Sequence, residues 1–233
     1  DNNTEIFKTK GSSYRQWVEV VKNYATNNEE EKRYWYNVLA DYDDMSNKPL
    51  DNLKVREDTR NCTNIELGKE LTQKLLKESN KAYNTQINDL LLTALGYTLY
   101  EITGNKVNHI VLEGHGREEI DSNIDITRTI GWFTTMYPVR LEVNENNYGI
   151  SKNRSIIDEL EDKIKYNKED LGNTIKHIKE TLRQIPNKGI GYGSLLGYRK
   201  ESPNLPRISF NYLGQFDDIN QKKEKDTSWQ ITD

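Results

Sequence analysis

The scarcity of cysteine and of long hydrophobic runs sets the first limits on this sequence. It contains one cysteine, Cys62, so no internal disulfide can form, which fits a reducing compartment and predicts a cytoplasmic protein. Hydrophobic residues make up only 34% of the chain, and no apolar run approaches the roughly 18 residues that a membrane-spanning helix needs. The first residues also lack the basic start and apolar centre of a signal peptide.

Several site motifs are missing as well. The three histidines, His109, His115 and His177, have no H-E-x-x-H spacing and no cysteine partners, so a metal site is not expected. No G-x-S-x-G nucleophile motif occurs. The glycines of the stretch 189–193 lack the spacing and the Lys-Ser/Thr pair of a phosphate loop, and they predict a flexible turn instead. A net charge of −4 and a pI of about 5.6 do not favour nucleic-acid binding.

Helical and strand patterns alternate along the chain, which predicts an α/β layered domain. The most apolar helical segment is 86–103, which we expect to be a central packing helix with Thr85 as its N-cap. Pro138 indicates an edge strand or a bulge. The pattern predicts helices at 12–25, 28–40, 69–82, 86–103, 151–166 and 172–184, and strands at 61–67, 107–113, 132–143 and 207–213.

The segment 107–113 is a short β-branched run that ends on a carboxylate, and Gly114 follows it directly. If it alternates as a strand, His109, Val111 and Glu113 share one face. Burial among apolar neighbours would raise the pKa of Glu113 and suit it to proton transfer. The alternative is an ordinary strand that ends in a solvated glutamate.

A second polar group lies near the C-terminus. Asn211 and Tyr212 point to opposite faces of an extended strand, so both can serve one site only if the chain bends there. Gly214 permits such a distortion. An ordinary buried pair is the alternative for these two residues, and Trp132 can equally belong to a structural unit with Arg128.

Five motifs in order resemble the epimerization domains of nonribosomal peptide synthetases, and they lie at 88–96, 113–118, 128–139, 186–193 and 210–217. The second motif reads Glu-Gly-His-Gly-Arg-Glu, which related condensation domains usually lack. The family's His-His-x-x-x-Asp-Gly motif is absent from the sequence. The resemblance implies that residues 1–217 are the C-terminal lobe of a condensation/epimerization-type domain, followed by a polar tail or linker at 218–233. The implied fold class is α/β, one lobe of a two-lobed chloramphenicol-acetyltransferase-like fold with a mixed β-sheet flanked by helices.

The activity that the resemblance implies is inversion, from L to D, of the Cα of an aminoacyl or peptidyl thioester. The substrate is carried on the phosphopantetheine arm of a peptidyl carrier domain, and no cofactor is expected to bind this chain directly. The expected partners are that carrier domain and the N-terminal lobe that bears the histidine motif. Neither nucleic acid nor a membrane is expected as a partner.

The resemblance also implies roles for individual residues. Glu113 is one proton carrier, and the second histidine of the absent motif is the other. Tyr212 is a proton or oxyanion donor, Asn211 positions groups in the site, and Arg117 is expected to fix the Glu113 loop by an ion pair. The remaining candidates support the site, and they are His115 as a hydrogen-bonding loop residue and Trp132 and Phe133 as channel floor or core.

Two other functions remain open. A condensation-type lobe would help to form peptide bonds, and a non-catalytic lobe would only bind a carrier domain. The 113–118 motif favours the epimerase. Because the histidine motif is absent, we expect the isolated lobe to be inactive.

Overall fold

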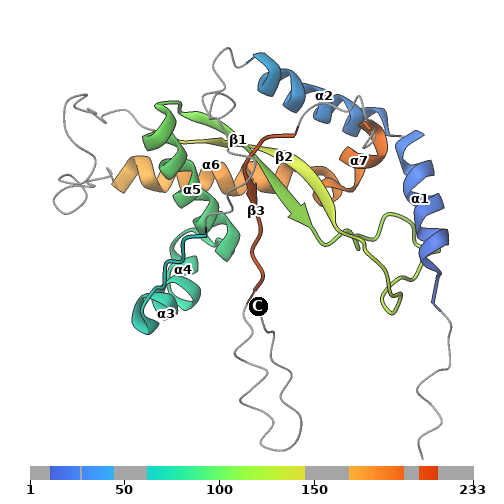
Figure 1. Cartoon of the computed structure of the whole chain (residues 1–233), viewed down its shortest axis with the longest axis horizontal. Coiled ribbons are helices and arrows are strands. Elements are labelled where there is room, and N and C mark those ends of the chain that lie inside the picture. The colour runs from blue at the N-terminus through green and yellow to red at the C-terminus, as the bar shows by residue number, and fades with distance from the viewer. Residues whose placement is uncertain (1–10, 27, 45–61, 145–167, 197–204, 215–233) are drawn as a thin grey trace, which may run out of the picture.

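A three-stranded mixed sheet is the centre of the protein, for which a computed structural model describes residues 11–26, 28–44, 62–144, 168–196 and 205–214. The strand order is β2-β1-β3 (Figure 1). Strand β1 (Val107–Gly114) pairs antiparallel with β2 (Thr135–Glu142) and parallel with β3 (Ser209–Phe210). The expected α/β class with a mixed sheet is therefore confirmed.

Helices surround this sheet, and several of them contact β1 or β2 (Figure 1). They are α1 (Tyr14–Thr26), α2 (Glu29–Asp44), α3 (Lys69–Lys77), α4 (Asn80–Tyr83), α5 (Ile87–Thr103), α6 (Lys168–Gln184) and α7 (Ile190–Leu196). A short 3-10 turn, η1 (Pro186–Gly189), joins α6 to α7. Helix α5 contacts both β1 and β2, and α2, α6 and α7 contact β2.

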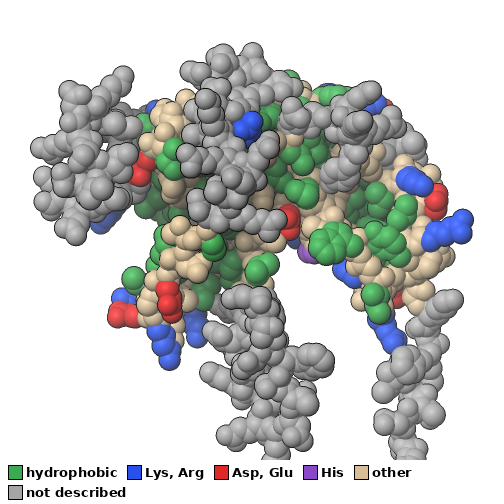
Figure 2. All heavy atoms as spheres, in the orientation of Figure 1, with side chains coloured by type: hydrophobic (Ala, Val, Ile, Leu, Met, Phe, Trp, Pro, Cys, Tyr) green, Lys and Arg blue, Asp and Glu red, His purple; other side chains and the backbone are tan. Residues whose placement is uncertain are grey.

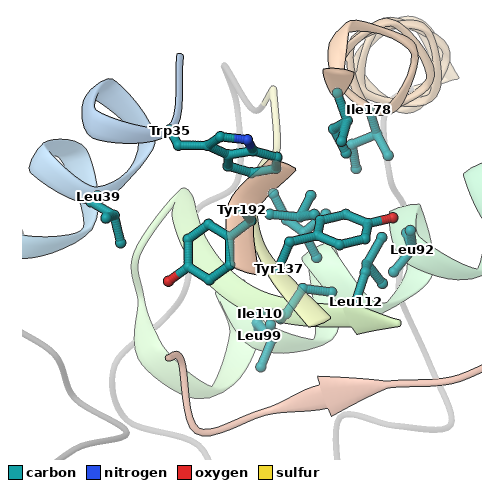
Figure 3. Close-up of a cluster of buried hydrophobic side chains, with 12 residues drawn as sticks. Trp35, Leu39, Leu92, Leu99, Ile110, Leu112, Tyr137, Ile178 and Tyr192 are labelled. Atoms are coloured by element: carbon teal, nitrogen blue, oxygen red, sulfur yellow. The ribbon is translucent and has the colours of Figure 1, made fainter. Parts of the chain in front are cut away.

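The main hydrophobic core lies between the sheet and these helices. Ile110 and Leu112 of β1 belong to this core together with Tyr137 of β2. Trp35 of α2 is fully buried, and its ring lies 5.9 Å from the ring of Tyr137 (Figure 3). Because large aromatic side chains bury much apolar area, this group holds α2 to the sheet.

Helix starts follow local capping chemistry. Ser13 and Gln16 form reciprocal side-chain to backbone hydrogen bonds at the start of α1, of 3.3 Å and 2.7 Å. At the start of α5 the expected cap at Thr85 is wrong by one residue, because Gln86 is the N-cap and forms a capping box with Asp89. The sequence thus located both helices correctly, with errors of one or two residues at their ends.

Other elements differ from the expectation. No strand forms within 62–68, and the helix expected at 69–82 is divided into α3 and α4. The glycines at 189–193 do not form a flexible loop, because Gly191 and Gly193 lie within α7. The last strand is only β3, two residues long, and the helix expected at 151–166 lies outside the described residues.

The proline expectation agrees with the sheet, because β2, which contains Pro138, is an edge strand of the described sheet. Within the part of the chain that the structure describes, none of the helices combines the length and the hydropathy needed to cross a bilayer.

Candidate functional site

Glu113 and Asn211 meet at the end of the parallel strand pair. Residues 111 and 112 of β1 lie opposite residues 209 and 210 of β3, so the same register brings position 113 beside position 211. The Asn211 side-chain amide donates a hydrogen bond of 2.9 Å from Nδ2 to Oε2 of Glu113. The sheet thus joins two motifs that are 98 residues apart in the sequence.

The expected burial of Glu113 is wrong. Residues 108–112 of β1 are all buried, whereas Glu113 itself is exposed. The reason is the short third strand, because β3 ends at Phe210 and Asn211 is also exposed. Glu113 is therefore a solvent-accessible carboxylate with a neutral amide partner.

Tyr212 is the third residue expected at this site, and it is half-buried. Among the described residues no hydrogen bond joins its hydroxyl to Glu113 or to Asn211. The alternation of side chains after β3 explains the separation, since residues 211 and 212 leave the backbone in opposite directions. The structure thus brings Asn211 to Glu113, but it does not bring Tyr212 into hydrogen-bonding contact with them.

Arg117 organises the loop that follows β1. Its guanidinium donates hydrogen bonds of 2.7 Å and 2.9 Å to the backbone carbonyls of Ile126 and Thr129. The same group lies 3.9 Å from the centre of the Phe133 ring, within the range of a cation–π contact. The ion pair expected for Arg117 is not among the contacts of the described residues, and carbonyl acceptors hold the loop instead.

His115 takes part in the same loop. Its Nδ1 accepts a hydrogen bond of 3.0 Å from the backbone N–H of Arg117, and its Nε2 lies 3.0 Å from a carboxylate oxygen of Glu118. An accepting Nδ1 implies that the proton of a neutral ring sits on Nε2. Both contacts lie within residues 115–118, directly after the end of β1.

The two aromatic candidates have different surroundings. Phe133 is buried in a small core with Trp17, Ile126 and Ile190, whereas 80% of Trp132 is exposed. A pocket of about 410 Å³ lies beside them, bounded by α1, α7 and the segment before β2. Hydrophobic side chains gather on this side of the molecule, over α1 and the loop before β2 (Figure 2).

Two further observations define the chemistry at this end of the sheet. Burial, together with the negative charge of Glu118, raises the pKa of Tyr137 to about 12, so this phenol stays protonated near neutral pH. No group of three His, Cys, Asp or Glu side chains within the described ranges is arranged to hold a metal ion.

Sequence reasoning missed one contributor to the site. The backbone carbonyl of Lys188, in η1, lies against Gly114, the residue after Glu113. The available signal was Asn187 two residues before Gly189, because asparagine and glycine are the residues that most readily adopt left-handed backbone conformations.

Comparison with known proteins gives a consistent family. The family model described as "Condensation domain" matches residues 2–232. Bacitracin synthase 3 of Bacillus licheniformis is 43% identical over 222 residues, and gramicidin S synthase 1 of Brevibacillus brevis is 40% identical over 227 residues. These matches cover 91% and 89% of this chain but only 3% and 18% of those two relatives.

A solved structure has the same fold. It is the epimerization domain from the third module of tyrocidine synthetase B, which matches with a TM-score of 0.59 and 33% sequence identity. The match covers 91% of this chain and 45% of that domain. The resemblance inferred from the motifs is thereby confirmed, and the chain belongs to the Condensation domain family, which it shares with the peptide synthases named above.

Proposed function

We propose that this chain supplies the Glu113 side of an epimerase site, which inverts the Cα of an aminoacyl or peptidyl thioester from L to D. The substrate is carried on the phosphopantetheine arm of a peptidyl carrier domain. The observation that supports the proposal most strongly is the Asn211–Glu113 hydrogen bond at the exposed end of β1. It joins two of the motifs that resemble those of epimerization domains, and the solved structure with the same fold is such a domain.

The geometry suits a proton carrier. Inversion requires that one group remove the Cα proton on one face while another returns a proton on the opposite face. In the described residues Asn211 engages Oε2 of Glu113, which leaves Oε1 to take or give the proton. Because the partner is a neutral amide, the contact orients the carboxylate without placing a permanent cation beside it.

The other residues have supporting roles in this proposal. Removal of the Cα proton leaves an enolate-like intermediate, whose oxygen needs hydrogen-bond donors. Tyr212, which is half-buried and directly follows Asn211, is the proposed donor to that oxygen. Arg117 and His115 hold the adjoining loop, while the second proton carrier is a histidine of the motif that this sequence lacks.

The direct test uses the parent synthetase that contains this sequence, loaded with an L-aminoacyl carrier thioester in deuterated solvent. The proposal predicts D-aminoacyl product that carries deuterium at Cα. Because two proton carriers are required, the 233 residues alone are expected to give no exchange. Turnover by the isolated chain would contradict this division of roles.

A condensation function is the second candidate, and the description of the matching family model favours it. It predicts that the loaded enzyme ligates the aminoacyl group to an acceptor amine with its configuration and its Cα hydrogen retained. The same experiment therefore separates the two functions when the acceptor is supplied.

A further inference from the structure

The turn before α7 has an unusual backbone. Asn187, Lys188 and Gly189 are consecutive residues with positive φ, of 39°, 46° and 85°. For residues other than glycine this conformation is unfavourable, and it persists only where the surroundings hold it. Pro186 fixes the start of the turn, and the preceding Ile185 is extended, as a residue before proline prefers.

One side of this turn packs against the end of β1. A Cβ added at Gly114 would lie 2.8 Å from the carbonyl oxygen of Lys188, so the backbone of the turn touches the residue that follows Glu113. A Cβ at Gly189 would lie 1.9 Å from Cδ1 of the Tyr137 ring, and Cε1 on the same edge of that ring would be 3.4 Å from a Cβ at Gly114. Tyr137 therefore fills the space between the turn and the strand end, within the core that Figure 3 shows.

The other side of the turn is tied to α1 and α2. The Asn187 amide donates to the hydroxyl of Tyr24, which in turn donates to the carboxylate of Glu31. Glu31 is only 3% exposed, and it also accepts a hydrogen bond of 3.1 Å from Nε1 of Trp35. Burial and the Glu31 carboxylate raise the pKa of Tyr24, so its hydroxyl keeps the proton that it donates.

We propose that Asn187 and Tyr24 are positioning residues for Glu113, acting through the Lys188 carbonyl and the Tyr137 ring on the backbone at Gly114. This inference rests on the proposed epimerase function. Helices α1 and α2 set the place of the turn, the turn sets the end of β1, and the end of β1 sets the carboxylate relative to Asn211. A catalytic group displaced by about 1 Å can lose roughly a hundredfold in rate, so this support affects turnover more than substrate binding.

The test measures Cα deuterium exchange by the parent synthetase with the single variants Asn187→Ala and Glu113→Asp and with the double variant. Glu113→Asp keeps a carboxylate but withdraws it by one methylene, so a residual rate can be measured. We expect Asn187→Ala to lower kcat about tenfold, with KM for the carrier-bound substrate within about twofold of normal. When Glu113→Asp is already present, adding Asn187→Ala is expected to lower kcat by a further factor of less than about two.

Tyr24→Phe is measured alongside, because it removes a single oxygen from the same chain of hydrogen bonds and keeps the ring that packs α1. Asn123→Ala is the matched control, since that amide is exposed and its hydrogen bond among the described residues is to Asp121, two residues away. An unchanged kcat in both Asn187→Ala and Tyr24→Phe would overturn the inference. It would also be overturned if the loss of kcat in the double variant equalled the product of the losses in Asn187→Ala and Glu113→Asp. Full exchange in Glu113→Asp and Glu113→Gln would instead refute the proposed function itself.

Discussion

Glu31 and Glu113 are two carboxylates linked through the turn at 187–189, and their surroundings are opposite. Glu31 is buried, and it accepts hydrogen bonds from Tyr24, Asn28 and Trp35. Glu113 is exposed and accepts one hydrogen bond, from Asn211. No cation pairs with Glu31 within the described residues, so its neutral donors compensate for its burial.

Under the proposed function, this difference separates a structural carboxylate from one that carries a proton. The oxygens of Glu31 are occupied by donors from α1 and α2, so this group holds two helices together and has little room for a substrate proton. Glu113 has an orienting partner on one oxygen and is accessible to solvent, which is what a proton carrier needs. Variants that alter the surroundings of one carboxylate and leave those of the other unchanged test this distinction.

The largest expected effect on stability comes from the turn that links the two glutamates. Gly189→Ala places a Cβ 1.9 Å from the Tyr137 ring in a residue with φ of 85°. We expect a loss of about 3–5 kcal/mol in the free energy of unfolding, from overpacking and from backbone strain. Urea unfolding measures it, with Gly68→Ala as the control, because a Cβ there meets no atom within 4 Å. Equal stability of the two variants would contradict this expectation, because it would show that the turn accepts a Cβ at residue 189 without loss of stability.

A smaller effect is expected from Glu31→Gln, which keeps the shape of the side chain but turns one acceptor oxygen into a donor. The new NH₂ group then faces the O–H of Tyr24 or the Nε1–H of Trp35, and two donors cannot bond each other. The free energy of unfolding should therefore fall by about 1–3 kcal/mol. Glu29→Gln is the matched control, because that side chain is 81% exposed and its ion pair with Lys32 is 3.6 Å long. If both variants unfold at the same urea concentration, Glu31 is not the structural member of the pair.

The smallest effect concerns acid stability at the far end of β2. A hydrogen bond from Arg140 is the main cause that lowers the pKa of Glu142 below its ordinary value of 4.5, and His177 adds to it. Because the folded pKa is the lower one, this group stabilises the fold above about pH 4.5 and loses that contribution as the pH falls. The contribution should stay below about 1 kcal/mol, because the pair is partly solvated. Glu142→Gln should therefore flatten the acid limb of a plot of unfolding free energy against pH, and an unchanged limb would contradict the assignment.

Local patterns were sufficient to predict β1 and α5, because β-branched runs and helical spacing are properties of the segments themselves. They could not predict the exposure of Glu113, which depends on where β3 ends. They also misread the 189–193 stretch, because the conformation of that segment depends on contacts with Tyr137 and Glu31 from distant parts of the chain. The pairing of Glu113 with Asn211 is likewise fixed by the parallel register of two strands, which no local pattern encodes.

Under the proposed function, Glu113 carries a proton to or from the substrate Cα. Its most direct test is Cα deuterium exchange by the parent synthetase with Glu113→Gln, compared with the unaltered enzyme. The account predicts a loss of about 10²- to 10⁴-fold in exchange, with the free energy of unfolding unchanged within about 0.5 kcal/mol. Exchange at a near-normal rate by a properly folded Glu113→Gln enzyme would contradict it.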